Sequence, residues 1–300
     1  MIKKISWVIG VTIIMIFSDT TAQRKNHYPL PSIEDNLANF NSHVNKLKIT
    51  PGQWRPMFNS EQICWISPKW GSQEYIYLDF PEAIFIDQQL IYLSHISDRF
   101  RAMYNYQLPK VQWKGNDSIL YYDRNLGSKI FFGGEVKIEN EDSVSLKLWI
   151  NNLTEDTLKN ILLQTCSFLH QIKEFDIKSD SNKFIHTKGK GWITLEDALS
   201  NRNSLPADGK FRAGWREGPA VSDIPVIIAT SVNKTHFVAM TWFENTYSFI
   251  GNAEHPCFHA DPFFPDIFPG ETKYIHGAII FYQGNFQEFA RNIENWKIIK

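Results

Sequence analysis

The stretch from residue 109 to residue 152 most constrains the fold, because it reads as four successive strands separated by short turns. The turns are predicted where Gly, Asn and Asp gather between the apolar segments. In the last segment, SVSLKLWI, every second residue is apolar, which is the pattern of a strand with one buried face. The four residues predicted on that face are Val144, Leu146, Leu148 and Ile150.

The rest of the chain continues this pattern, with few helices. Strands are predicted at residues 74–81, 161–169 and 277–284, and residues 224–243 read as a hairpin. Helical spacing occurs in residues 33–47, in a short stretch near residues 194–199 and near the end of the chain. The last of these is an amphipathic helix with Phe286, Phe289, Ile293 and Trp296 on one side. Residues 170–220 are predicted to be loop-rich and to hold a short helix and little else. Strands that follow one another directly favour antiparallel sheets.

The first 22 residues predict a signal peptide. Two lysines precede an apolar run over residues 5–17, and small residues follow it. We therefore expect a secreted or periplasmic protein, with an N-terminal arm over residues 23–58 and a β-sandwich domain over residues 59–300. No later run reaches the length that crosses a membrane, so no further membrane span is expected.

Composition narrows the classes of partner. A formal net charge of −1 and a pI near 6.8 argue against nucleic acid as a partner. Aromatic residues make up 14% of the chain and include ten Trp. Both a sugar-binding surface and a large β core favour such rings. The three cysteines are an odd number, so either one pair is bridged or all three are free thiols.

The sequence GNAEHPCFHADPFFPDIFPGE, residues 251–271, concentrates groups that carry chemistry. Four of them occupy alternate positions: His255, Cys257, His259 and Asp261. The interspersed prolines exclude a helix, so a His-x-x-x-His metal site of the helical kind is not expected. In an extended chain these four side chains form one row, with neighbours roughly 6–7 Å apart.

Three interpretations of this row stay open. In the first, His259 and Asp261 bond to backbone amides and stiffen a loop, and Cys257 belongs to the core. In the second, a histidine or carboxylate acts as an acid or base on a sugar. In the third, His255, His259 and Asp261 bind a divalent metal ion, which requires a further ligand that no second motif supplies.

The order of these segments resembles the β-supersandwich of galactose-mutarotase-like proteins. It is similar in particular to a group of secreted bacterial proteins of unknown function. The features that carry this likeness are a Cys-x-His-x-Asp-Pro element at residues 257–262, a Pro-Gly-Glu turn at residues 269–271, and a GxIxFxxG strand at residues 277–284 before a terminal helix. The resemblance implies an all-β antiparallel supersandwich with an N-terminal arm and a C-terminal helix. It implies carbohydrate as the ligand class and assigns no reaction.

Further candidate residues lie near the motif. His259, preferred over His255, is the predicted proton donor, with Glu244 or Asp261 as the accepting carboxylate. Trp242 and Trp215 are candidate sugar platforms, and so are Trp192 and Trp54. Arg212 and His255 are candidate substrate-binding residues, since a guanidinium binds a sugar carboxylate in a bidentate fork. The plain alternatives are a core position for Trp242, a solvated charge for Glu244 and a surface ion pair for Arg212.

These observations predict a secreted carbohydrate-active protein that binds or acts on a saccharide through a histidine and a carboxylate. An enzyme of this kind would be an epimerase, a glycosidase or a lyase. One alternative is a non-catalytic glycan-binding or envelope-associated protein. Another is a metal-dependent hydrolase, which would need a divalent metal as its cofactor; no other cofactor is expected.

Overall fold

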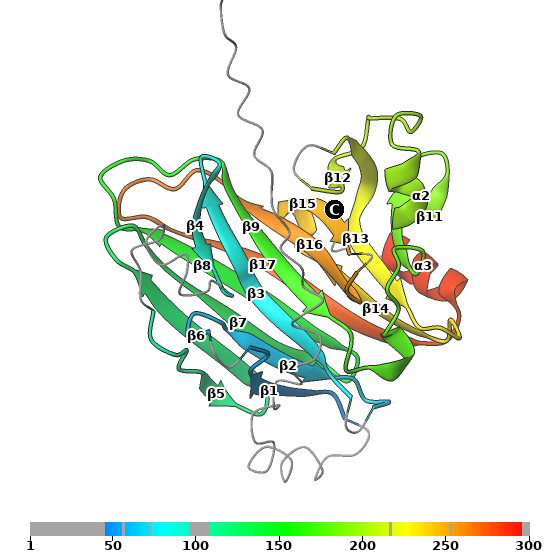
Figure 1. Ribbon diagram of the computed structural model, residues 1–300, viewed down its shortest axis with the longest axis horizontal. Helices are drawn as coiled ribbons and strands as arrows, with labels where there is room; N and C mark the ends of the chain where they lie inside the picture. The colour runs from blue at the N-terminus through cyan, green and yellow to red at the C-terminus, as the bar shows by residue number, and fades with distance from the viewer. Residues whose placement is uncertain are drawn as a thin grey trace, which may run out of the picture.

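The computed structural model describes residues 46–55, 58–71, 74–95, 108–215, 218–252 and 254–295. The predicted signal peptide and residues 23–45 of the predicted arm lie outside this part of the chain. The predicted all-β antiparallel sandwich with a C-terminal helix is confirmed (Figure 1). None of the helices in the described ranges is long and apolar enough to cross a membrane.

One layer of the sandwich is formed by strands from distant parts of the sequence. They pair in the order β1–β2–β3–β9–β16–β15–β12, and β4 pairs with the far end of β3. Only the β12–β15 pair is parallel within this layer. The strands are β1 Lys48–Gly52, β2 Ile63–Ser67, β3 Ile76–Ile86, β4 Gln89–Leu93, β9 Ile161–Phe168, β12 Phe211–Ala213, β15 Thr246–Gly251 and β16 Cys257–Phe264.

The second layer contains the four consecutive strands predicted from residues 109–152. Its pairing order is β5–β6–β7–β8–β17–β14. The strands are β5 Lys114–Asn116, β6 Ile119–Leu126, β7 Ile130–Asn140, β8 Ser143–Asn152, β14 His236–Thr241 and β17 Thr272–Gln283. In β8 the side chains at 144, 146, 148 and 150 are buried and those between them are half-exposed, as predicted.

Strand β13, Ala220–Thr230, belongs to both layers. Its first part pairs with β12, where Ser222 lies opposite Phe211. Its second part pairs with β14, where Val226 lies opposite Thr241. The two layers are therefore joined by one continuous strand as well as by the core between them.

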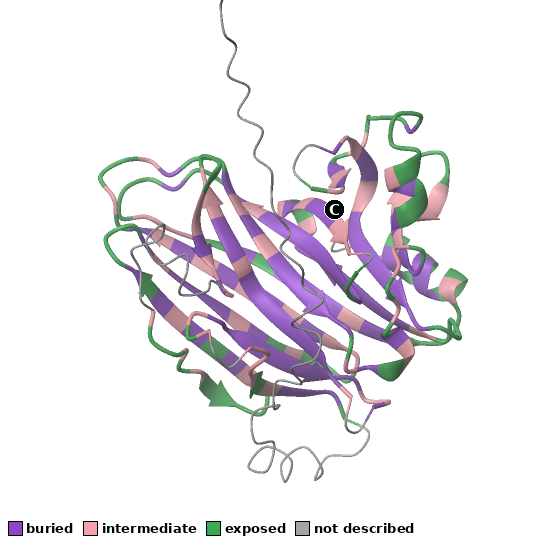
Figure 2. Ribbon diagram, in the orientation of Figure 1, coloured by how far each residue is buried: buried purple, intermediate pink, exposed green. Residues whose placement is uncertain are grey.

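The main core fills the space between the layers, where Figure 2 shows the strands buried along most of their length. Leu78 of β3 and Phe258 of β16 belong to the same apolar cluster as Leu146 of β8 and Ile279 of β17. The Tyr122 hydroxyl of β6 also donates a hydrogen bond of 2.5 Å to the carbonyl of Phe80 in β3. Contacts of this kind hold the layers face to face.

Helix α3, Phe286–Glu294, is the predicted C-terminal helix. It starts at Asn285, whose side chain accepts a hydrogen bond of 2.8 Å from the backbone N–H of Glu288. Phe289 and Ile293 pack on the outer face of β13 and β14. Trp296, predicted on the same side, lies outside the described residues.

The region of residues 170–220 contains more structure than predicted. The short helix is present as α2, Leu195–Ser200, and a single turn of 3-10 helix occurs at Lys173–Phe175. A second such turn, Phe243–Asn245, lies outside this region. The expectation of little else was wrong, because β10 Lys183–Thr187, β11 Gly191–Thr194 and β12 also form. Each is five residues or fewer. Strands β10 and β12 pair with β13, which is distant in the sequence from β10, and β11 pairs with β10.

Candidate functional site: a cleft above strand β16

The Cys-His-Asp row lies in a strand, as the extended interpretation requires. Strand β16 begins at Cys257 and runs between β15 and β9, so it is an inner strand of its layer. Phe258 and Ala260 point into the main core. Cys257, His259 and Asp261 therefore project from the opposite face. His255 comes just before the strand, in a bend.

Neighbouring strands add further groups to this face. Cys166 of β9 lies opposite His259 of β16, and Asp79 of β3 lies opposite Cys166. Residues that face each other across antiparallel strands share one side of the sheet. Three strands that are far apart in the sequence thus place a carboxylate, a thiol and an imidazole in one row.

A cavity of about 440 Å³ opens above this row. Its size is within the range of small-molecule sites. Its lining combines aromatic rings, charged groups and amides: Trp54, Arg55, Glu82, Leu93, His95, Gln164, Cys166, Trp215, Ile250, Gly251, Asn252, His255, Cys257 and His259. We call this cavity the β16 cleft.

Both ring nitrogens of His259 face protein groups at the floor of the β16 cleft. Nε2 lies 3.9 Å from the Sγ of Cys257. Nδ1 lies 3.4 Å from Oδ1 of Asp261 and 3.9 Å from Oε2 of Glu82. The side chain is only 9% exposed, and Nδ1 makes no well-aligned hydrogen bond to the described residues. His259 is therefore placed to act on its neighbours more directly than on a ligand.

The electrostatics of this cluster couple Cys257 to His259. Burial alone would lower the pKa of His259, but Asp261 and Cys257 raise it well above its usual range. A hydrogen bond with the Cys166 thiol lowers the pKa of Cys257 well below its usual range against the effect of burial, and His259 acts in the same direction. Each of the two groups thus favours the charged form of the other.

Glu82 reaches the β16 cleft because β3 is irregular where it passes β9. Asp79 lies opposite Cys166 and Ala83 lies opposite Gln164, so the segment between them contains extra residues on the β3 side. Such bulges redirect side chains next to functional sites. Burial raises the pKa of Glu82, opposed by His259 and Arg55. A carboxyl group whose pKa is raised by burial, and which lines a cavity, is a candidate for proton transfer.

A buried ion cluster forms one wall of the β16 cleft. Arg55 donates to Glu61 at 2.7 Å and to Asp79 at 3.1 Å. Its guanidinium also lies 4.1 Å from the ring of Trp54, which stacks on Phe168 with centroids 4.4 Å apart. The half-buried ring of Trp54 is therefore packed against both a guanidinium and a phenyl ring, which fix its position in this wall.

His95 lies on the same wall, 3.6 Å from Glu82. Burial lowers its pKa to about 3, and the positive charge of Arg55 contributes in the same direction. The imidazole of His95 is thus neutral at physiological pH and can both donate and accept a hydrogen bond.

The structure brings several predicted site residues together. His255, His259 and Trp215 all line the β16 cleft, and Asp261 lies beneath it as the partner of His259. Trp215 follows β12 and is 46% exposed. An aromatic ring face in this position is suited to contact with a ligand.

Other predicted residues lie elsewhere. Trp242 is completely buried and donates its indole N–H to Thr165, so the sugar-platform interpretation is corrected to a core position. Glu244 is exposed and does not line the β16 cleft. Arg212 donates to the carbonyl of Gly218 at 2.6 Å and lines a different cavity together with Arg202.

Sequence reasoning missed five groups of the β16 cleft: Arg55, Glu82, His95, Gln164 and Cys166. Gln164 and Cys166 were predicted to lie in a strand. The sequence did not indicate that this strand pairs with β16 or which of its faces lines the cleft. Glu82 depends on the irregularity in β3. The only signal of this irregularity in the sequence was the interruption of the apolar pattern by Asp79, Pro81 and Glu82.

Two groups of residues in the described ranges bring potential metal ligands within 4.8 Å of one another. One consists of Cys166, Cys257 and His259, and the other of Asp79, Glu82 and His95. The predicted trio His255, His259 and Asp261 is not among them. His259 and Asp261 lie 3.4 Å apart, but His255 joins neither group, and Cys166 from β9 and Cys257 are the residues grouped with His259.

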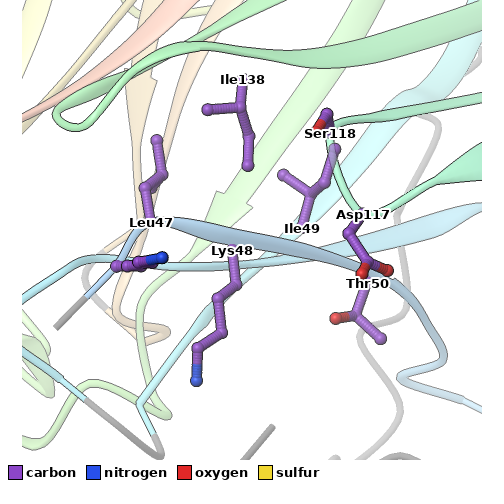
Figure 3. Close-up of a pocket in the computed structure, with 8 residues that line it drawn as sticks. Leu47, Lys48, Ile49, Thr50, Asp117, Ser118 and Ile138 are labelled. Atoms are coloured by element: carbon purple, nitrogen blue, oxygen red, sulfur yellow. The ribbon is translucent and has the colours of Figure 1, made fainter. Parts of the chain in front are cut away.

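A second cavity, of about 300 Å³, lies between β1 and the β5–β6 turn (Figure 3). Aliphatic side chains of Leu47, Ile49 and Ile138 line much of it, and Asp117 and Ser118 lie at the turn. Asp117 is its single carboxylate, and its lining contains no histidine or cysteine. Of these two cavities, the β16 cleft has the larger set of titratable side chains.

No protein-family model matches the chain, and no curated protein matches it. Solved structures to which it is similar include a galactose 1-epimerase from Lactobacillus acidophilus (9% identity, TM-score 0.35, covering 81% of this chain and 100% of that one). They also include an aldose epimerase homologue from C. elegans (7%, TM-score 0.37, 80% and 97%). A heparan sulfate lyase from Pedobacter heparinus has 9% identity and a TM-score of 0.36 over 73% of this chain, which spans 25% of the lyase.

Proposed function

We propose that the protein binds a saccharide in the β16 cleft and that Glu82 transfers a proton to or from it. The observation that carries this proposal is the meeting of an exposed indole, Trp215, and a carboxyl group, Glu82, in one cavity. A flat apolar ring and a directed proton carrier are what a sugar, with its apolar faces and polar edges, requires.

The remaining lining supports a polyhydroxylated ligand. Gln164, Asn252 and neutral His95 each offer both donors and acceptors. Arg55 is held by Glu61 and Asp79, so its charge is largely compensated within the wall. A cleft of mixed hydrogen-bonding character suits hydroxyl groups better than it suits a purely apolar ligand.

In this proposal His259 positions Glu82 instead of meeting the sugar itself, because both of its ring nitrogens face protein groups. The chemistry is proton transfer at a sugar centre, as an epimerase, a glycosidase or a lyase would use. Glu82 thus takes the role that the sequence suggested for Glu244, which is exposed and does not line the cleft.

A panel of oligosaccharides tests the proposal, with binding and product release measured on the same samples. Glu82→Gln should keep binding and lower turnover by about 10²–10⁴-fold, the usual contribution of a general acid or base. Trp215→Ala should weaken binding by about tenfold, since an aromatic contact contributes roughly 0.5–1.5 kcal/mol beyond its buried area.

Glu244→Gln is the matched control, because this carboxylate is exposed and does not line the β16 cleft. It should change neither measurement. Unchanged turnover in Glu82→Gln would remove the proton-transfer role. Binding without turnover of any glycan would leave a non-catalytic glycan-binding protein, and an absence of binding across the panel would contradict the saccharide itself.

We also propose that residues 1–22 direct secretion, since they combine lysines, an apolar run and small residues. Expression of the full chain with fractionation of the cells tests this. The protein should be found outside the cytoplasm with its first residues removed, as read from the mass of the intact protein. An unprocessed protein in the cytoplasm would contradict secretion.

A further inference from the structure

The floor of the β16 cleft holds a group of sulfur and nitrogen ligand atoms, none of which carries the proton in the proposed function. Cys166 comes from β9, and Cys257 and His259 come from β16. One potential ligand atom from each lies within 4.8 Å of the other two. All three side chains are buried, and all three line the cleft.

The pairing of the strands fixes this arrangement. Cys166 lies directly opposite His259, and Cys257 is two residues earlier on the same face of β16. Neighbouring positions on one face of a sheet are close enough for side chains to share a ligand. Because β9 and β16 are both inner strands, the three groups are held by a rigid part of the fold.

We propose that Cys166, Cys257 and His259 form a zinc-binding site whose fourth position opens toward the β16 cleft. Two thiolates and one imidazole are ligands that zinc prefers, and three protein ligands with an open position are typical of a catalytic zinc site. The Cys257 Sγ and His259 Nε2 atoms are 3.9 Å apart. In a tetrahedral zinc site these atoms lie about 3.6 Å apart, from bonds of about 2.3 Å to sulfur and 2.1 Å to nitrogen.

The surroundings of His259 fit a metal on Nε2. Its other nitrogen, Nδ1, lies 3.4 Å from Oδ1 of Asp261. Histidines that bind a metal usually donate their second N–H to a carboxylate or carbonyl, which fixes the orientation of the ring. Asp261 is itself held in place, because it accepts a hydrogen bond of 3.1 Å from the backbone of Thr165.

The second group of ligand atoms, Asp79, Glu82 and His95, is less suited to a metal. The guanidinium of Arg55 already lies 3.1 Å from Asp79. Ser94 also donates a hydrogen bond of 2.5 Å to the same carboxylate oxygen. A cation therefore occupies the place of a metal there, whereas no Lys or Arg ion pair involves the cysteine group within the described ranges.

The zinc site is independent of the saccharide proposal, because it can be measured without any glycan. With zinc bound, His259 would hold the metal and Glu82 would remain the proton carrier beside it. Loss of the metal with glycan binding intact, or the reverse, would separate the two proposals.

Elemental analysis of the purified protein, kept reduced and loaded with zinc before dialysis, tests the site. About one zinc ion per chain should remain. Loading with Co²⁺ instead should give the thiolate-to-cobalt charge-transfer absorption that reports cysteine ligands. Both measurements use the unmodified protein, so they do not depend on whether a variant folds.

Variants then assign the ligands. Cys166→Ser and His259→Asn should each lose the bound zinc, and Asp261→Asn should lower the affinity by about 10–100-fold, as changes beside a metal ligand usually do. Cys64→Ala is the matched control, because Cys64 is buried in the main core on the other face of the sheet and should leave the zinc content unchanged.

Three results would overturn the site. One is a reduced protein that retains no zinc and shows no cobalt charge-transfer band. Another is zinc retained at full stoichiometry in folded Cys166→Ser, which would place the metal elsewhere. The third is a Cys166–Cys257 disulfide in the isolated protein, found by peptide mass spectrometry, with no metal bound after its reduction.

Discussion

Asp261 accepts a hydrogen bond from the backbone N–H of Thr165, at 3.1 Å, where the ladder between β9 and β16 is interrupted. The same carboxylate oxygen lies 3.4 Å from His259. One side chain thus replaces a missing backbone acceptor and orients the imidazole above it. Asp261 can therefore both stabilise the fold, through Thr165, and orient a functional histidine, His259.

Replacement of Asp261 should therefore destabilise the fold. Asp261→Ala leaves the buried N–H of Thr165 without this acceptor and should lower the free energy of unfolding by about 1–3 kcal/mol. Urea denaturation followed by tryptophan fluorescence measures the change. Asp266→Ala is the control, because Asp266 is exposed and should have little effect. Equal stability of the two variants would refute a structural role for Asp261.

Trp242 is expected to matter for stability and not for ligand binding. Its ring is completely buried, and its indole N–H donates to Thr165 Oγ1 at 3.1 Å. Trp242→Ala should lower the free energy of unfolding by about 3–5 kcal/mol, and Trp242→Phe by less. If Trp242→Phe folds but binds glycan markedly more weakly, the assignment of this residue to the core is incomplete.

Lys183 forms a buried ion pair whose partner can be removed. Its side chain is 1% exposed, and its Nζ lies 3.1 Å from Oδ1 of Asp180. Asp180→Ala leaves a buried charge uncompensated and should cost about 3–5 kcal/mol of stability. Adding Lys183→Met to that variant should recover most of the loss. Thermal or urea unfolding of the single and double variants gives the comparison, and no recovery in the double variant would contradict it.

His95 should make stability depend on pH. Burial lowers its pKa to about 3, and Arg55 contributes to this. In the unfolded chain His95 binds a proton near its ordinary pKa of 6.5, so stability is fully present above that pH and falls as the pH decreases toward 3. The loss should stay below about 1.4 kcal/mol per pH unit, since the side chain is still 32% exposed.

The variant His95→Gln isolates this effect from that of Glu82, which lies 3.6 Å from His95 and whose pKa is raised by burial. Unfolding free energies are compared at pH 7 and pH 5 for both proteins. The decrease between these values should be smaller in His95→Gln than in the unmodified protein. An equal decrease would show that His95 is protonated as easily in the folded state as in the unfolded one.

Local patterns in the sequence were sufficient for much of the fold. The alternation in β8 and the apolar side of α3 follow from spacing alone, because each element buries one face against a single neighbour. The prolines around β16 excluded a helix, so the common side of His259 and Asp261 also followed from local geometry.

The composition of the cleft could not be derived in the same way. Trp215 and Trp242 both occur near strand ends in the sequence, yet one is 46% exposed and the other fully buried. Their difference depends on packing between distant segments. Glu82 and Cys166 join the cleft only through the pairing of β9 with β3 and β16, and a single sequence does not contain that register.

The strand shared by both layers has a consequence for how the molecule loses its structure. Separating either sheet from β13 would disrupt the strand with which the other sheet also pairs. The layers are therefore not separate cooperative units. Local unfolding that begins near β12 should extend to β14 through the continuous backbone of β13. The β16 cleft and strand β8 should therefore unfold in a single cooperative transition.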